Sequence, residues 1–370
     1  MRYLISGGGT AGHINPAIAI ASEIKKRDKN ATIVFVGTKA GLETKLVINE
    51  GYELKLIDVK GLKRSLSLDN VKILFKAIRA MGDAKKIIKS FKPNIVIGTG
   101  GYVSGPVVKA AQQLKIPTVI HEQNAFWGVT TKMLAKHADK LLLSFPPSKE
   151  QNAEYKNTVV TGNPVRLEFG NFEKQSSRRT MFLSDNKPLV LIYGGSLGAK
   201  TINDSLVAML PTIKKENKIS IIAGVGKRDC DYIKKDVEKL GIKFNTDGDI
   251  QIKEYIYDMP RIMAACDLVV CRSGAITLAE LALLEKPCIL IPSPNVAENH
   301  QYYNAKVFSD IGAAEMILDK DVNGDTLLET INSIVFNKKK LESMSKASKK
   351  LAFKNASSQI GEIIMKTAKK

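Results

Sequence analysis

The chain has 370 residues, of which 44% are hydrophobic and 25% charged, and this balance excludes a disordered protein and a single small domain. The formal net charge of +19 favours an anionic partner, namely a nucleic acid, an acidic membrane surface or a phosphorylated substrate, unless it reflects a general lysine bias. Aromatic residues make up only 6% and no nucleic-acid-binding module is recognisable, so we expect no nucleic-acid partner.

The cysteines and the apolar runs indicate where the protein resides. The four cysteines form no C-x-x-C pair, and three of them lie in or beside apolar runs, which is typical of reduced core thiols. No apolar run approaches the roughly 18 residues that span a bilayer, and the first residues read as a strand rather than a signal peptide. We therefore expect a cytosolic protein that is still able to lie on a membrane.

The first strand leads directly into a glycine-rich turn. The apolar residues Tyr3–Ile5 precede Gly7–His13, and helical sequence follows from Ala17. Such a turn brings backbone N–H groups and the positive end of a helix to one point, which suits a phosphate or a developing oxyanion. Its glycines also fit G-x-G-x-x-G, but the second strand, Ala31–Val36, is followed by Gly-Thr-Lys and no acid that would bind the ribose of NAD.

His13 stands at the start of the first predicted helix. A positive charge is disfavoured there, so one interpretation is a neutral imidazole that accepts a proton. The other interpretation is a polar residue that only caps the helix.

The stretch from Leu62 to Lys89 alternates apolar with basic residues. A basic amphipathic helix can lay its apolar side on a bilayer while its cations meet anionic lipid. It can equally pack its apolar side on a protein core with its basic side in solvent. The candidate membrane-docking residues are Leu66, Ile73, Leu74, Phe75, Lys76, Ile78, Arg79 and Met81.

Strands and helices continue to alternate, which predicts an α/β protein with parallel sheets. A second glycine turn, Thr99–Pro106, follows the strand Asn94–Gly98, and the strand Pro117–Ile120 ends in the polar run His121–Asn124. Open α/β sheets bind ligands at this end of their strands. A second half begins near Lys187 and repeats the unit of strand, glycine loop and helix.

In the second half, Glu280 lies about two turns into a helix that follows the strand Asp267–Cys271. Its carboxylate can accept both hydroxyl groups of a ribose, or it is an ordinary surface residue. The sequence Asp247-Gly248-Asp249 reads as a turn rather than a metal site. The chain has no P-loop motif, no G-x-S-x-G elbow and no metal cluster among its four histidines, so we expect neither a metal nor a cofactor.

Taken together, the motifs resemble the signatures of the MurG family, within glycosyltransferase family 28, in the same order over nearly the whole chain. The motifs that carry this resemblance are Gly8–Pro16, Gly98–Pro106, His121–Asn124, Gly162–Arg166, Gly194–Ala199, Cys271–Ala275 with Glu280, and His300–Gln301 with Asn304–Ala305.

The resemblance implies a GT-B fold, in which two Rossmann-like domains with parallel sheets face each other across a deep cleft. We expect an N-terminal domain, residues 1–163, that binds the acceptor and carries the membrane-docking face. Residues 164–350 would form the domain that binds UDP-N-acetylglucosamine, and residues 351–370 a helix that packs back on the first domain.

The resemblance also implies an activity. It is the inverting transfer of N-acetylglucosamine from UDP-N-acetylglucosamine to the C4 hydroxyl of the muramoyl sugar of undecaprenyl-pyrophosphoryl-MurNAc-pentapeptide (lipid I), which gives lipid II for peptidoglycan synthesis. The expected location is peripheral, on the cytoplasmic face of the bacterial cell membrane, where an anionic surface and other cell-wall synthesis proteins are further partners. The alternatives are another GT-B enzyme, such as a glycolipid glycosyltransferase or a UDP-N-acetylglucosamine 2-epimerase, and a non-catalytic binder.

Residue roles follow from the same resemblance. His13 is the candidate catalytic base, because histidine titrates near neutrality. The lipid-linked acceptor also favours the membrane-docking interpretation of Leu66 to Met81. The implied donor-binding residues are Thr10, Ala11, Gly12, Asn124, Arg166, Ser196, Ile256, Ala275, Ile276, Thr277, Leu278, Glu280 and Gln301.

Overall fold

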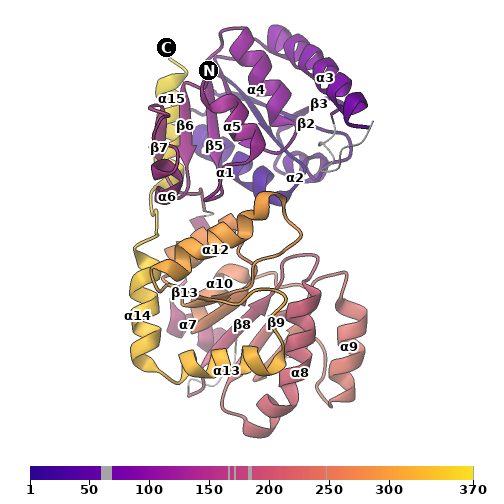
Figure 1. Ribbon diagram of the computed structural model, residues 1–370, viewed down its shortest axis with the longest axis vertical. Helices are drawn as coiled ribbons and strands as arrows, with labels where there is room; N and C mark the ends of the chain where they lie inside the picture. Colours follow the sequence, from indigo (N-terminus) through magenta and orange to yellow (C-terminus); the bar gives the residue numbers. More distant parts are fainter. Residues whose placement is uncertain (60–68, 166, 171, 182–185, 247, 370) are drawn as a thin grey trace. The chain divides into compact units, whose positions relative to one another are not determined.

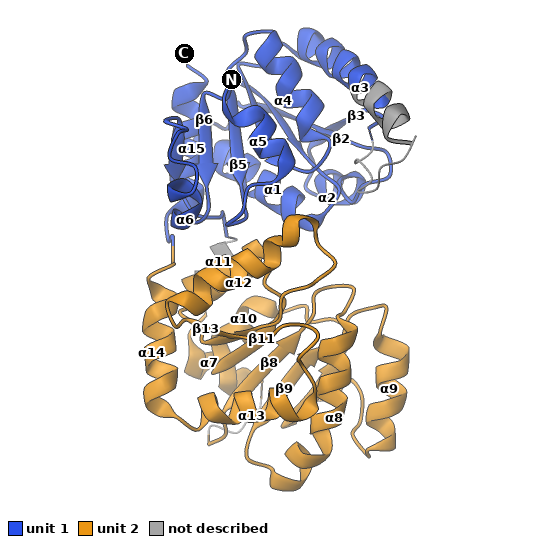
Figure 2. Cartoon of the chain, in the orientation of Figure 1, with its two compact units in different colours: residues 1–165, 353–370 blue, residues 166–352 orange. Residues whose placement is uncertain are grey.

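The structure is a computed structural model that describes residues 1–59, 69–165, 167–170, 172–181, 186–246 and 248–369. It divides into two compact units (Figure 2), of which unit 1 comprises Met1–Val165 with Phe353–Lys370 and unit 2 comprises Arg166–Ala352. Each unit is a parallel sheet with helices packed against it (Figure 1). The predicted α/β class with two Rossmann-like domains is therefore confirmed.

Unit 1 contains a seven-stranded parallel sheet in the order β3-β2-β1-β4-β5-β6-β7. Its strands are β1 Arg2–Gly7, β2 Thr32–Gly37, β3 Glu53–Leu56, β4 Ile95–Gly100, β5 Thr118–Glu122, β6 Lys140–Leu143 and β7 Thr158–Val160. Its helices are α1 Ala11–Arg27, α2 Glu43–Asn49, α3 Asp69–Phe91, α4 Ser104–Gln113, α5 Val129–Ala135, α6 Pro146–Glu150 and α15 Ala356–Thr367.

The central strands of unit 1 are apolar on both faces, because helices cover both sides of the sheet. Along β1, Tyr3 and Ile5 pack into one core with Ile20 of α1, whereas Leu4 packs into another with Val107 of α4. All five side chains are completely buried. The period of two along the strand thus divides one continuous apolar run between two cores.

The last helix, α15, belongs to unit 1 although it is far from the other elements in sequence. Its Ile360 and Ile364 are fully buried and join the core that contains Ile5 and Ile20. Arg27 at the end of α1 donates hydrogen bonds to the backbone and side-chain oxygens of Ser358, at 3.0 and 2.7 Å. The C-terminal segment therefore completes one face of the first sheet.

Unit 2 contains a six-stranded parallel sheet in the order β10-β9-β8-β11-β12-β13. Its strands are β8 Leu189–Tyr193, β9 Ser220–Gly224, β10 Ile250–Lys253, β11 Leu268–Cys271, β12 Cys288–Leu290 and β13 Ala314–Met316. Its helices are α7 Lys174–Thr180, α8 Lys200–Glu216, α9 Cys230–Lys239, α10 Met259–Ala265, α11 Ala275–Leu283, α12 His300–Asp310, α13 Gly324–Val335 and α14 Lys338–Lys349, with the short 3-10 turns η1 Leu167–Gly170 and η2 Ala297–Asn299.

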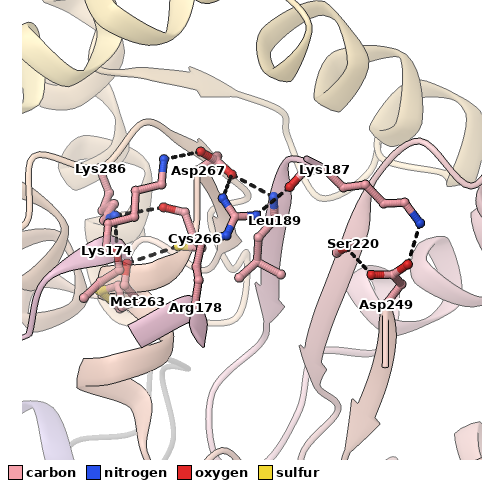
Figure 3. A network of polar contacts seen from close by, with 11 residues as sticks. Lys174, Arg178, Lys187, Leu189, Ser220, Asp249, Met263, Cys266, Asp267 and Lys286 are labelled. Carbon is pink, nitrogen blue, oxygen red and sulfur yellow. Dashed lines mark hydrogen bonds and ion pairs between the residues drawn. The ribbon is translucent and has the colours of Figure 1, made fainter. Parts of the chain in front are cut away.

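A polar network holds the amino ends of the strands of unit 2 (Figure 3). Asp267, just before β11, accepts hydrogen bonds from the Leu189 backbone N–H at 2.8 Å and from the buried Arg178 at 3.3 Å, and it forms an ion pair with Lys174. The buried Lys286 donates to the carbonyl oxygens of Ala264 and Cys266, at 2.7 and 2.8 Å, where α10 ends. Burial of Lys286 lowers its pKa. These hydrogen bonds and ion pairs therefore connect neighbouring elements at the edge of the sheet where its strands begin.

Candidate active site

In each unit, the strand order reverses beside the first strand. In unit 1 the chain runs from β1 outward to β3 and then returns to β4 on the other side of β1. The turns after β1 and β4 therefore meet at the carboxyl edge of the sheet, where open α/β sheets bind ligands. In unit 2 the corresponding point lies between β8 and β11.

His13 lies at the reversal point of unit 1, in the first turn of α1. Its backbone N–H donates to Thr10 O at 3.1 Å, and its backbone oxygen accepts from Thr99 Oγ1 at 2.8 Å. Gly100 has a φ of +101°, and a Cβ there would lie 2.6 Å from His13 Nδ1. The second glycine turn thus leaves room for the half-buried imidazole ring.

The polar run that ends β5 reaches His13 through Gln123. The Oε1 atom of Gln123 lies 3.0 Å from His13 Nδ1, and its Nε2 atom lies 2.9 Å from His121 Nδ1. His121 Nε2 in turn lies 3.2 Å from Gly162 O. Burial lowers the pKa of His121 to about 4, so this ring is neutral at neutral pH. The sequence predicted a ligand-binding strand end here, but it did not predict the contact with His13.

Glu43 of α2 is a buried carboxylate that no sequence motif singles out. It accepts hydrogen bonds from the Gly9 backbone N–H at 3.1 Å and from the Thr38 backbone N–H and hydroxyl, both at 2.8 Å. One N–H of the first glycine turn is therefore engaged by the protein's own carboxylate rather than directed at a ligand. The following residues, Thr10 to Gly12, are exposed or half-exposed at the start of α1.

Asn124 is held at the end of β5 by its neighbour Glu122. The Glu122 carboxylate accepts from the backbone and side-chain nitrogens of Asn124 at 3.1 and 3.2 Å, from Gly128 N at 3.1 Å and from Thr131 Oγ1 at 2.6 Å. These bonds fix the loop after β5, in which Asn124 directly follows Gln123.

At the reversal point of unit 2, a glycine loop joins β8 to α8. Gly198 has a φ of +88°, and a Cβ there would lie 2.3 Å from Val225 O, so only glycine fits. Asn203 of α8 donates to the same Val225 oxygen at 2.8 Å and thereby fixes the loop against the end of β9. Ser196 is exposed at the tip of this loop, beside the start of the 17-residue helix α8.

The other predicted donor-binding residues of unit 2 gather around the start of α11. Ala275 and Leu278 are buried in its first turn, and Ile276, Thr277 and Glu280 are half-buried. Burial is the main cause that raises the pKa of Tyr193, which ends β8, and the neighbouring Cys271 and Glu280 raise it further. This shift places the Glu280 carboxylate in electrostatic reach of the strand at the reversal point.

Gln301 reaches the same helix start from α12. Its backbone oxygen accepts from Ser273 Oγ at 2.7 Å, and its side-chain Oε1 accepts from Ser293 N at 2.8 Å. Ser273 immediately precedes the cap of α11, so these bonds tie the starts of α11 and α12 together.

Ile256 follows β10 at the carboxyl edge of the same sheet. Its side chain is buried against Gly224, where an added Cβ would lie 3.1 Å from Ile256 Cδ1. Of the remaining predicted donor-binding residues, Arg166 lies outside the described part of the chain.

Asp249 of the Asp-x-Asp sequence lies just before β10, at the opposite edge of the sheet. Asp247 is outside the described residues, while Asp249 bonds to Lys187 at 2.5 Å and to Ser220 at 2.9 Å (Figure 3). Burial raises the pKa of Asp249, but the hydrogen bonds from Lys187 and Ser220 lower it more, so the net shift is downward. Within the described ranges, no group of three or more His, Cys, Asp or Glu side chains is placed to hold a metal ion.

Two family models match the chain, one for the N-terminal domain of glycosyltransferase family 28 over residues 3–143 and one for its C-terminal domain over residues 189–360. The chain belongs to glycosyltransferase family 28. The predicted family resemblance and the prediction of a glycosyltransferase are therefore confirmed.

Relatives of this family 28 chain agree with the assignment. An Acetivibrio thermocellus protein named UDP-N-acetylglucosamine--N-acetylmuramyl-(pentapeptide) pyrophosphoryl-undecaprenol N-acetylglucosamine transferase is 43% identical over 98% of this chain and 97% of its own length. The crystal structure of Acinetobacter baumannii MurG matches with a TM-score of 0.79 at 27% identity, covering 99% of both chains. A UDP-GlcNAc 2-epimerase from Neisseria meningitidis matches with a TM-score of 0.67 at 16% identity, covering 99% of this chain and all of that one, which shows a common fold alone.

The predicted membrane-docking residues of the family 28 enzyme are only partly described. Leu66 lies outside the described residues, and so do the side chains of Ile73, Leu74 and Phe75, whose backbone belongs to α3. Further along α3, Ile78 is 54% exposed and Arg79 is exposed, whereas Met81 packs against the core of unit 1. Lys76 forms an ion pair with Asp58 at 3.1 Å. Among the described helices, none is both long enough and apolar enough to cross a bilayer.

Proposed function

We propose that this enzyme transfers N-acetylglucosamine from UDP-N-acetylglucosamine to the C4 hydroxyl of the muramoyl sugar of lipid I and so produces lipid II. The observation that carries the proposal is the relative named for this transfer, which is 43% identical over nearly the full length of both chains. The positions of the motif residues at the two strand-order reversals support it, because each lies where such sheets bind ligands.

The donor binds mainly to unit 2 in this proposal. The loop that carries Ser196 and the positive end of α8 hold the diphosphate, because backbone N–H groups and a helix N-terminus favour an anion. The backbone of Ile256 contacts the uracil, and Glu280 accepts hydrogen bonds from the ribose hydroxyl groups. Ala275 to Leu278 line the same place. Arg166 contacts the nucleotide.

The sugar of the donor is held by two amide side chains and one loop. Since Gln301 Oε1 already accepts from Ser293 N, its NH₂ group is the end that donates to a sugar hydroxyl. Asn124, fixed by Glu122, is the second amide. The exposed turn Thr10 to Gly12 faces the donor sugar and the pyrophosphate of the acceptor.

The reaction is a single in-line displacement, which accounts for inversion. His13 Nε2 removes the proton of the acceptor C4 hydroxyl as its oxygen attacks the anomeric carbon of N-acetylglucosamine. The bond from that carbon to the UDP oxygen breaks, and UDP leaves with the bonding electron pair. The start of α8 and the loop N–H groups stabilise the negative charge that develops on the leaving diphosphate.

The enzyme works at the cytoplasmic face of the bacterial membrane, where α3 docks on anionic lipid. The exposed Ile78 and Arg79 support this part of the proposal, since one offers apolar surface and the other a cation. The net charge of +19 adds attraction to an anionic leaflet. Other cell-wall synthesis proteins remain candidate partners.

The test is a transfer assay with radiolabelled UDP-N-acetylglucosamine and a short-chain lipid I analogue. We expect wild type to form labelled disaccharide lipid. Replacement His13→Ala should lower kcat by about 10²- to 10⁴-fold, because the base is lost, while leaving UDP-N-acetylglucosamine binding intact. The matched control is His137→Ala, at an exposed histidine that follows α5.

Three results would contradict the proposal. Release of UDP without labelled lipid would indicate another acceptor, as for a different glycolipid glycosyltransferase. Conversion of the donor to its C2 epimer would indicate an epimerase. Donor binding without any reaction would indicate a non-catalytic binder.

A further inference from the structure

The chain of hydrogen bonds behind His13 begins at an atom that can only accept. Gly162 O is a carbonyl oxygen, and it lies 3.2 Å from His121 Nε2. The proton between them must therefore reside on His121 Nε2. Because His121 is neutral, its other nitrogen, Nδ1, carries a lone pair and accepts.

The orientation of the Gln123 amide follows from two further contacts. Its Nε2 atom lies 2.9 Å from His121 Nδ1, which carries the lone pair, and also 2.9 Å from the backbone oxygen of His121. An amide turned the other way would place an oxygen against that backbone oxygen and against that lone pair, and both contacts would be repulsive. The NH₂ group of Gln123 therefore faces His121, and both of its protons are used.

The remaining end of the amide faces His13. Gln123 Oε1 lies 3.0 Å from His13 Nδ1 and can only accept, so the proton resides on His13 Nδ1. In the neutral ring the lone pair is then on Nε2, for which the described residues offer no hydrogen-bond partner. We propose that Gln123, oriented by His121 and Gly162 O, is a positioning residue that keeps His13 in the Nδ1–H tautomer and leaves Nε2 free to accept the acceptor's proton.

Burial makes this orientation difficult to reverse. Gln123 is 2% exposed and His121 is 1% exposed, so water does not replace a lost partner for either side chain. Two carboxylates on neighbouring elements of unit 1 are engaged with other partners, Glu122 with Asn124, Gly128 and Thr131, and Glu43 with Gly9 and Thr38. The partner of His13 is thus a neutral amide, which fixes the tautomer without placing a negative charge beside the ring.

The first test reads the tautomer in the unmodified protein and does not depend on activity. The chain has four histidines, so ¹⁵N-labelled histidine spectra are assignable with single histidine variants. At neutral pH we expect His13 to show a protonated Nδ1 and an unprotonated Nε2, and His121 to show the reverse. A wild-type His13 with its proton on Nε2 would overturn the proposal, whatever the enzyme transfers.

The second test replaces the positioning residue. In Gln123→Leu we expect His13 to become a mixture of tautomers, with kcat for transfer lower by roughly ten- to hundredfold and the KM for UDP-N-acetylglucosamine unchanged. Gln123→Glu supplies an anionic acceptor in the same place, so it should retain the Nδ1–H tautomer of His13. It should also shift the pH profile of kcat, on its acidic side and on its basic side. Gln112→Leu is the matched control, because Gln112 is a half-buried glutamine of α4 whose amide bonds to Leu134 O at 3.0 Å, outside this chain of contacts.

The outcomes separate this inference from the proposed function, on which it rests. Unchanged tautomer and unchanged kcat in Gln123→Leu would overturn the positioning role while leaving the transferase intact. Equal losses in Gln123→Leu and Gln112→Leu, without a tautomer change, would indicate a merely structural role. Absence of lipid product in wild type would overturn the proposed function, and the tautomer of His13 would still be measurable.

Discussion

Two histidines of unit 1 are separated by a single glutamine side chain, and their surroundings give them different properties. His13 is half-buried at the start of a helix, whereas His121 is 1% exposed inside the sheet. Burial lowers the pKa of His121 to about 4, from an ordinary value near 6.5. Only the more exposed ring is suited to exchange protons with a substrate.

The buried histidine predicts a dependence of stability on pH. Because the folded pKa is below the unfolded one, the unfolded chain binds a proton first, and the free energy of unfolding falls as the pH drops from about 6.5 to about 4. The contribution of His121 across this range is about 3 kcal/mol. Urea titrations of wild type and His121→Gln at several pH values should show their difference shrinking toward pH 4. The exposed His137→Gln should run parallel to wild type, and a parallel His121→Gln curve would contradict the prediction.

The sequence patterns point to residue types of the candidate site but not to the contacts between them. The glycine turns, His13, Glu280 and the polar end of β5 were all selected from local patterns. Glu43 and the Gln123 bridge were not, because their roles depend on partners that are 34 and 110 residues away along the chain. A local sequence pattern contains no information about contacts between residues so far apart along the chain.

At the scale of elements, α3 presents some residues to the core of unit 1 and others to the surface. The sequence pattern is compatible with two interpretations of this stretch, a helix that packs on the protein core and a helix that docks on a membrane. Met81 packs inward as in an ordinary core helix, whereas Ile78 is 54% exposed. Amphipathicity alone could not separate these positions, because it does not say how wide the buried stripe is.

The exposed part of α3 predicts binding to membranes. In the double variant with Ile78→Glu and Arg79→Glu, apolar area and a cation are both lost, so sedimentation with anionic lipid vesicles should fall at least severalfold. Soluble donor binding should be unchanged. Ile311→Glu, at an isoleucine of unit 2 that is 42% exposed, is the control. Equal vesicle binding by all three proteins would exclude α3 as the docking face.

At the scale of the whole molecule, the alternation of strands and helices was sufficient to predict two parallel sheets. Strand order was not available from the pattern, since buried strands such as β1 and β4 look alike in sequence. The order β3-β2-β1-β4 nevertheless decides where the site lies, because it brings the two glycine turns of unit 1 together.

The last helix predicts a long-range contribution to stability. Ile364→Ala should lower the free energy of unfolding by about 2–5 kcal/mol, because it leaves a cavity against the core that contains Ile5 and Ile20. Glu362→Ala changes only an exposed ion pair on the same helix and should leave the melting temperature near that of wild type. Similar thermal scans for both variants would contradict the packing of α15 described above.

The same helix sets the order in which the polypeptide can mature during translation. Residues 1–165 are made before residues 166–352, yet the residues that complete their unit, 353–370, are made only after them. Until then, the apolar side of α1 that Ile360 and Ile364 cover lacks its partner, while all of 166–352 has already emerged. Unit 2 begins second but is thus the first to be complete, and a chain truncated before residue 353 retains both sheets but leaves part of one core of unit 1 without its partner helix.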